Sequence, residues 1–114
     1  VHLDGCSLGG YVGLEVFLRR PDAFVAWGGV QSAFGAHRAP AYGAALASAV
    51  ARAPRPLHVE TSEGDPFHDA NVALAKELAR RGVPHELSVL PGPHDQPWLR
   101  EAGTVDMLFW HDRV

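Results

Sequence analysis

Cysteine is almost absent from this sequence, and Cys6 is the only one in 114 residues. A single thiol forms no internal disulfide and builds no thiolate cage for structural zinc. Long apolar runs are absent as well, which leaves no candidate for a membrane-spanning helix. We therefore expect stability to come from one hydrophobic core, which is what a chain of this length buries as a single domain.

An excess of charge of one sign is also lacking. Ten Lys and Arg residues oppose thirteen Asp and Glu residues, the net charge is −3, and no segment carries a basic stripe. Nucleic-acid binding depends on such a stripe, because lysines and arginines neutralise the phosphates. The charge balance therefore argues against nucleic acid as a partner, and 46% hydrophobic and 20% charged residues are typical of a globular domain.

The sequence starts at Val1 instead of a methionine, and a glycine-rich motif follows within a few residues. We therefore expect residues 1–114 to be one part of a longer domain. A signal peptide would lie upstream of this part, so the sequence leaves the cellular location open.

Apolar periodicity divides the chain into alternating strands and helices. The predicted strands are 1–3, 23–30, 56–62 and 85–90, and the predicted helices are 8–20, 39–52, 70–81 and a last helix from Pro97. Asp69 is predicted to cap the third helix, and Pro91-Gly92-Pro93 is predicted to form a turn. The apolar positions of the last helix are Leu99, Ala102, Val105 and Leu108.

Strict alternation of strand and helix is typical of a three-layer α/β/α fold with a mostly parallel sheet and helices on both faces. In such a fold, ligands bind beyond the carboxyl ends of the strands. Residues that directly follow a predicted strand are therefore the first candidates for a functional site.

The strongest local signal is the motif G-x-S-x-G, formed by Gly5, Ser7 and Gly9. It lies between a predicted strand and a predicted helix, where a sharp turn would present the Ser7 hydroxyl above the sheet. Glycines on both sides would let the neighbouring backbone approach closely. The amide of Leu8 would face a developing oxyanion at the positive end of the helix dipole.

Two other interpretations of this turn are open. It could be a tightly packed structural turn, or a loop that cradles a phosphate. The phosphate-binding P-loop requires a lysine where this sequence has Tyr11, and the sequence contains no G-x-G-x-x-G motif.

A serine acts as a nucleophile only with a base and an orienting acid, and candidates for both follow predicted strands. Asp65 lies in a turn after the third strand, and His94 lies in a proline-rich segment after the fourth. Asp65 is equally compatible with an ordinary turn aspartate. His68 and Asp69 lack a third ligand at a suitable spacing, so no metal site is predicted.

Ser7, Asp65 and His94 occur in the order serine, acid, histidine, and in this the chain resembles the C-terminal half of an α/β-hydrolase fold esterase. More narrowly, it is similar to the esterase family that includes feruloyl esterases, S-formylglutathione hydrolases and mycolyl-transferring antigens. The similarity rests on the segments 5–10, 64–74 and 92–98, which together extend over most of the chain.

This resemblance implies a serine hydrolase that cleaves carboxylic esters through an acyl-enzyme and needs no cofactor. It assigns Ser7 as the nucleophile, His94 as the general base and then acid, and Asp65 as the residue that orients His94. Leu8 would provide one backbone amide to the oxyanion hole. Members of the family have several strands and a loop with a second oxyanion donor before the serine motif, so we expect residues 1–114 to be a partial domain without them.

Two alternatives to the hydrolase are open. An acyltransferase would use the same three residues with an alcohol in place of water. A non-catalytic flavodoxin-like fragment would hold Ser7 and His94 beyond hydrogen-bond reach. For a small ester substrate, Phe34 and Trp98 are the candidate contacts, because Phe34 lies in the segment 31–42 after a strand and Trp98 lies beside His94.

Overall fold

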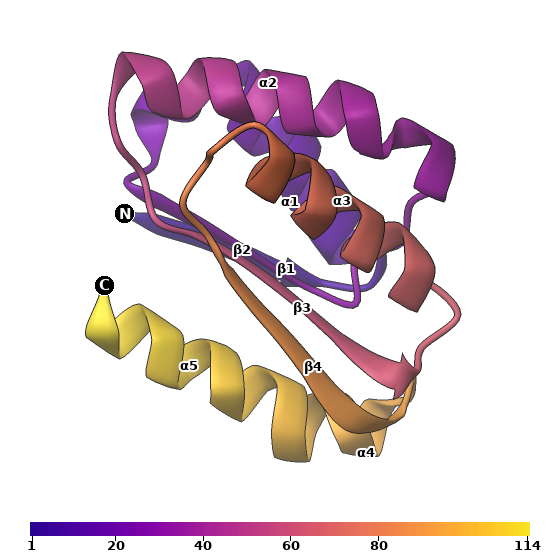
Figure 1. Cartoon of the computed structure of the whole chain (residues 1–114). Helices are drawn as coiled ribbons and strands as arrows, with labels where there is room; N and C mark the ends of the chain where they lie inside the picture. The colour runs from indigo at the N-terminus through magenta and orange to yellow at the C-terminus, as the bar shows by residue number, and fades with distance from the viewer.

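Short extended segments alternate with helices along the chain and pair into one sheet in the structure, a computed structural model that describes residues 1–114. The strands are β1 (His2–Cys6), β2 (Ala26–Val30), β3 (Leu57–Gly64) and β4 (Glu86–Pro93). All four are parallel and lie in the order β1-β2-β3-β4 (Figure 1). All five residues of β2 are buried, as expected for a strand that is covered on both faces.

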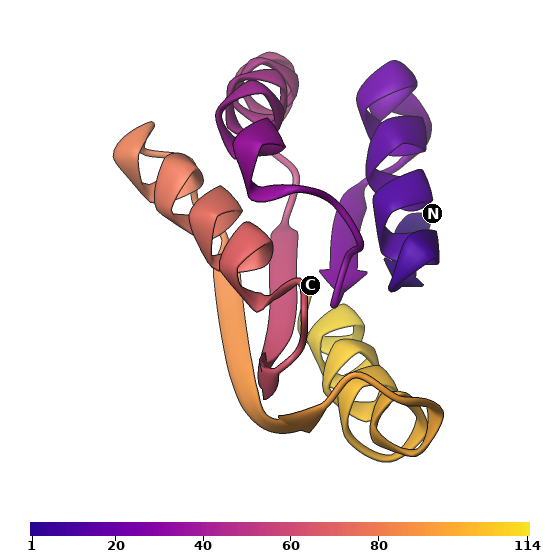
Figure 2. The ribbon, with the colours of Figure 1, turned by 90° about the vertical axis from the view of Figure 1, so that its right-hand side faces the viewer.

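Three helices connect successive strands: α1 (Leu8–Arg19), α2 (Ala39–Arg52) and α3 (His68–Arg80). Because parallel crossovers are right-handed and the strands lie in sequence order, all three helices cover the same face of the sheet (Figure 2). The C-terminal segment covers the other face with α4 (Gln96–Trp98), the π-helical turn Leu99–Gly103 and α5 (Thr104–Arg113). The three-layer α/β/α class is thus confirmed.

The sheet separates two apolar cores. Along β3, Leu57 and Val59 point into the larger core beneath α1, α2 and α3, while His58 and Glu60 alternate with them and are buried on the α5 side. The smaller core, between the sheet and α5, contains Met107 and Trp110. No helix combines the length and the apolar composition that a bilayer crossing requires.

Several predicted boundaries need correction. Helix 39–52 is predicted to the residue, but β2 starts at Ala26, because the short 3-10 turn Pro21–Ala23 precedes it. The predicted turn Pro91-Gly92-Pro93 belongs to β4 instead, and Pro93 pairs with Gly64 of β3 after a register shift.

The apolar face of the C-terminal helix also differs from the prediction. Val105 and Leu108 are exposed, at 40% and 60%, whereas Met107 and Trp110 are buried. The physical reason is the predicted spacing of three residues. An α-helix turns by about 100° per residue, so each such step falls about 60° short of a full turn and the series leaves the buried face.

This difference predicts how two leucine substitutions compare. Leu46 of α2 has no exposed surface and packs in the larger core, so Leu46→Ala should lower the free energy of unfolding by about 2–5 kcal/mol. Leu108→Ala is the matched control and should change it by no more than about 0.5 kcal/mol. Urea unfolding followed by circular dichroism measures both, and a large cost for Leu108→Ala would contradict the observed packing of α5.

Candidate active site

Ser7 occupies the turn between β1 and α1. Its backbone has φ 55° and ψ −121°, a conformation that residues other than glycine rarely adopt. Four backbone hydrogen bonds hold it there. Its N–H donates to the Val30 carbonyl at 2.8 Å, and its carbonyl accepts from the amides of Gly10, Tyr11 and Ala33 at 3.0–3.2 Å. A strained, well-supported turn of this kind directs the serine side chain away from the sheet edge.

Two glycines make the turn possible, and they are not the pair that the motif suggests. A Cβ atom at Gly5 would collide with the Gly9 carbonyl, and one at Gly10 would collide with the Ser32 side chain. A Cβ atom at Gly9 would meet nothing within 4 Å. The close contact between strand and helix therefore requires Gly5 and Gly10, and the expectation that Gly9 is needed for close approach is wrong.

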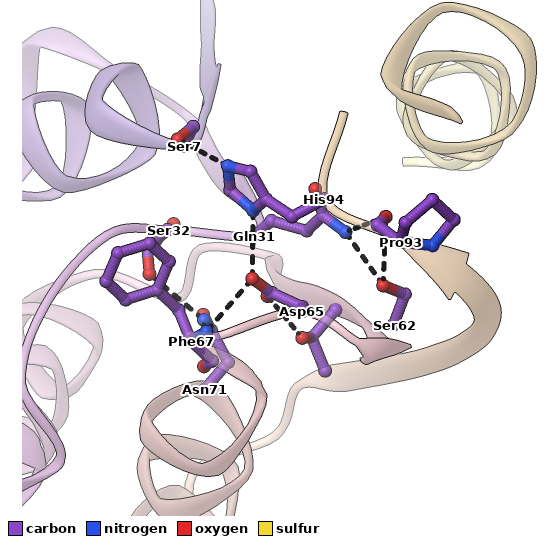
Figure 3. A network of polar contacts seen from close by, with 10 residues as sticks. Ser7, Gln31, Ser32, Ser62, Asp65, Phe67, Asn71, Pro93 and His94 are labelled. Carbon is purple, nitrogen blue, oxygen red and sulfur yellow. Dashed lines mark hydrogen bonds and ion pairs between the residues drawn. The ribbon is translucent and has the colours of Figure 1, made fainter. Parts of the chain in front are cut away.

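His94 links Ser7 to Asp65, as Figure 3 shows. Its Nε2 lies 2.8 Å from Ser7 Oγ, and its Nδ1 lies 2.9 Å from Asp65 Oδ1. When Nδ1 carries the proton, it donates to the carboxylate, and Nε2 is free to accept from the hydroxyl. The three predicted residues, which are 58 and 29 positions apart in sequence order, are thus brought into one hydrogen-bonded chain.

Asp65 is held on both oxygens. Its side chain is fully buried, Oδ2 accepts from Thr61 Oγ1 at 2.7 Å, and Oδ1 also accepts from the Phe67 amide at 3.0 Å. The Asp65 carboxylate and carbonyl thus bind the amides that begin α3, with the His68 amide on the carbonyl at 3.0 Å. Asp69, predicted as the cap, is inside the helix and lies 2.9 Å from His68 Nδ1 instead.

Gln31 is a site residue that the sequence analysis missed. It directly follows β2, has a positive φ of 49°, and has no exposed surface. Its side-chain amide donates to Ser62 Oγ at 2.8 Å and to the Pro93 carbonyl at 3.0 Å (Figure 3). Because Pro93 immediately precedes His94, Gln31 fixes the backbone that carries the histidine. The sequence feature that could have identified Gln31 is its position directly after a buried strand.

Trp98 supports the same segment from the other side. Its indole Nε1–H donates to the Pro91 carbonyl at 2.8 Å, and its ring lies so close to Gly92 that a Cβ atom there would collide with it. Only 8% of Trp98 is exposed. The prediction that Trp98 contacts substrate is therefore replaced by a packing role beneath the His94 segment.

Phe34 is also corrected. Its side chain belongs to the larger core, is 5% exposed, and packs edge-on against Tyr42 with 5.4 Å between the ring centroids. A ring that is covered in this way has no surface left for a substrate. The 31–42 segment therefore contributes core packing at this position.

The Leu8 amide starts α1, so it has no acceptor within the helix. It points from the positive end of a helix of 12 residues that has no acidic side chain in its first turn. The two principal cavities of the molecule, with volumes of about 520 and 440 Å³, are not lined by Ser7 or His94. Ser7 and His94 are themselves partly exposed.

The two motif glycines are expected to respond oppositely to alanine. Gly5→Ala forces apart the backbone of the turn between β1 and α1 and should cost about 1–3 kcal/mol of stability. Gly9→Ala meets open space on an exposed helix position and should be neutral or stabilising by up to about 1 kcal/mol. Thermal unfolding of the pair measures this, and equal costs would contradict the strand–helix contact described above.

The two hydrogen bonds donated by the Gln31 side-chain amide give another prediction. Gln31→Ala removes both of its hydrogen bonds inside the protein, so it should lower the free energy of unfolding by about 1–3 kcal/mol. The control is Gln96→Ala, because Gln96 is an exposed glutamine at the start of α4. Urea unfolding of both variants measures this. An unchanged free energy of unfolding in Gln31→Ala would show that the two hydrogen bonds make no net contribution to stability.

No protein family model matches this sequence, and no curated protein matches it either. Solved structures do match. S-formylglutathione hydrolase from Staphylococcus aureus aligns with 95% of this chain and 49% of its own, with a TM-score of 0.75 and 21% identity. The fluorophosphonate-binding serine hydrolase FphF from Staphylococcus aureus, with substrate bound, aligns with 95% of this chain and 52% of its own, with a TM-score of 0.77 and 19% identity.

A ferulic acid esterase is similar over 93% of this chain and 48% of its own, with a TM-score of 0.72 and 18% identity. This chain therefore spans about half the length of these three proteins. At such identities the similarity concerns the fold, and it agrees with the parallel sheet and its two helical layers. Residues 1–114 thus have the fold of about half of an α/β-hydrolase domain.

Proposed function

We propose that the protein is a serine hydrolase that cleaves carboxylic esters, with Ser7, His94 and Asp65 as its catalytic residues. The single observation that carries this proposal is the contact of 2.8 Å between Ser7 Oγ and His94 Nε2, continued by 2.9 Å from His94 Nδ1 to Asp65. Such a chain is the arrangement by which a serine hydroxyl becomes a nucleophile near neutral pH. A flavodoxin-like binding fragment has no need of it.

In the first step, Ser7 Oγ attacks the ester carbonyl carbon while His94 Nε2 takes the hydroxyl proton. The carbonyl oxygen becomes an oxyanion, which the Leu8 amide and the N-terminus of α1 stabilise. Collapse of this intermediate breaks the ester bond, and His94 returns the proton to the departing alcohol. Ser7 then carries the acyl group.

In the second step, His94 takes a proton from water as the water attacks the acyl carbon. The bond from that carbon to Ser7 Oγ then breaks, His94 returns the proton to Oγ, and the acid leaves. Asp65 keeps the proton on Nδ1 and stabilises the imidazolium that forms in each step. Its burial and its bonds to Thr61 and Phe67 hold the carboxylate in one orientation for that task. These steps use side chains and backbone amides of this chain.

The structural neighbours support the same class of reaction, because their names describe an S-formylglutathione hydrolase, a serine hydrolase and a ferulic acid esterase. In this proposal, residues 1–114 contribute the nucleophile, base and acid of an α/β-hydrolase domain. A second oxyanion donor comes from the rest of such a domain. The loss of one such donor costs about 10²–10³ in rate, so we expect residues 1–114 alone to react slowly.

Labelling with a fluorophosphonate tests the proposal. The 114-residue protein should gain one probe mass in intact-mass spectrometry, and Ser7→Ala should gain none, because the probe reacts only with an activated serine. Ser48→Ala is the matched control: Ser48 is an exposed serine on α2, and its loss should leave labelling unchanged. Absence of an adduct on the folded wild type, or an adduct that survives in Ser7→Ala, would contradict the proposed role of Ser7.

A further inference from the structure

A second cluster of polar side chains is buried between the sheet and α5. It combines His58 and Glu60 of β3, Ser88 of β4 and Asp106 of α5. His58 Nε2 lies 3.0 Å from Ser88 Oγ and 3.8 Å from Asp106 Oδ2. One ligand atom from each of His58, Glu60 and Asp106 falls within 4.8 Å of the other two. The proposed ester chemistry uses none of these residues.

Glu60 is the unusual member of this cluster. Its side chain has no exposed surface, no basic residue pairs with it, and no neighbouring N–H or hydroxyl group donates to its carboxylate oxygens; the group within hydrogen-bond reach is the acidic Asp106 carboxyl. A buried carboxyl without a partner is costly, so such a group takes up a positive charge of some kind. A bound proton and a bound cation are the two candidates.

We propose that His58, Glu60 and Asp106 form a binding site for one divalent first-row cation such as Zn²⁺ or Mn²⁺. Two carboxylates balance the double charge of the ion, and an imidazole nitrogen is a ligand that these metals accept and that Mg²⁺ and Ca²⁺ seldom use. The Ser88 hydroxyl lies beside His58 Nε2 and completes a polar shell. This proposal does not depend on the hydrolase activity.

The histidine favours a cation over a proton that is merely shared by the two carboxyls. A shared proton needs only Glu60 and Asp106, whereas the imidazole of His58, two residues before Glu60 on the same face of β3, faces the same point. Burial lowers the pKa of His58. Burial and the neighbouring Asp106 carboxylate raise the pKa of Glu60 to about 10, so the cation would displace a proton from Glu60.

Gly103 and Asp106 border the cluster on the α5 side. The backbone of Gly103, at the end of the π-helical turn, packs closely against the cluster, because a Cβ atom there would lie 3.0 Å from Glu60 Oε2 and 2.6 Å from the Trp98 ring. The Asp106 side chain is 34% exposed, while its Oδ2 atom is buried within the cluster. Donor atoms around tetrahedral zinc are about 3.4 Å apart, so the cluster would contract on binding, with the partly exposed Asp106 moving inward.

Calorimetric titration of the 114-residue protein with ZnCl₂ and MnCl₂ tests the site. We use a His2→Ala background, because the exposed contacts of His111 with His2 and Asp4 would form a competing site. One ion should bind per chain, and elemental analysis of the dialysed protein should confirm that ratio. Glu60→Gln and Asp106→Asn should each weaken binding by about 100-fold or more, because each replaces an anionic carboxylate ligand by a neutral amide.

Asp112→Asn is the matched control, since Asp112 is an exposed aspartate on α5, and it should leave the affinity unchanged. Circular dichroism verifies that each variant is folded; Glu60→Gln replaces a neutral acid by a neutral amide of the same shape. Absence of stoichiometric binding to the folded protein would overturn the proposal and leave a shared proton as the partner of Glu60. Binding that is equally strong in Glu60→Gln and Asp106→Asn would overturn it too, because the ion would then lie elsewhere.

Discussion

The contact between the end of β1 and the first turn of α1 is the constraint on which the rest of the site depends. Gly5 faces the Gly9 backbone, and Gly10 faces Ser32, at distances that exclude a side chain. Ser7 is thereby held at φ 55°, with its carbonyl bonded to the amide of Ala33 beyond β2. The strain at this one residue is balanced by backbone hydrogen bonds, so the hydroxyl keeps a fixed direction.

The parallel sheet then brings the remaining groups to the same edge. Each strand is followed closely by one member of the site: β1 by Ser7, β2 by Gln31, β3 by Asp65 and β4 by His94. Gln31 lies between the other strand ends and connects β2 to β3 and β4 through its amide. The hydrogen bonds of Gln31 therefore contribute both to the stability of the sheet edge and to the position of His94 relative to Ser7 and Asp65.

Much of this arrangement was predictable, because alternation of strand and helix specifies a parallel sheet and residues after strands must gather at its carboxyl edge. That reasoning was sufficient for the fold class and for the positions of Ser7, Asp65 and His94. Local sequence patterns did not predict the roles of residues whose contacts depend on the tertiary structure. Gln31 carries no motif, and its role appears only when β4 is placed beside β3. Asp69 has the sequence position of a helix cap, but Asp65 is the residue that accepts hydrogen bonds from the Phe67 and His68 amides.

The buried cluster around Glu60 shows the same limit of local patterns. His58 and Glu60 are two positions apart, which in a strand places both on one face, but Asp106 joins them only through the packing of α5. In the same way, the π-helical turn and the buried side of α5 follow from the contacts of α5 with the sheet.

The central claim concerns the orientation of His94. Nitrogen-15 NMR of its neutral imidazole tests it directly: we predict a proton on Nδ1 and none on Nε2. A ring that carries its proton on Nε2 would donate to Ser7, and that result would contradict the account.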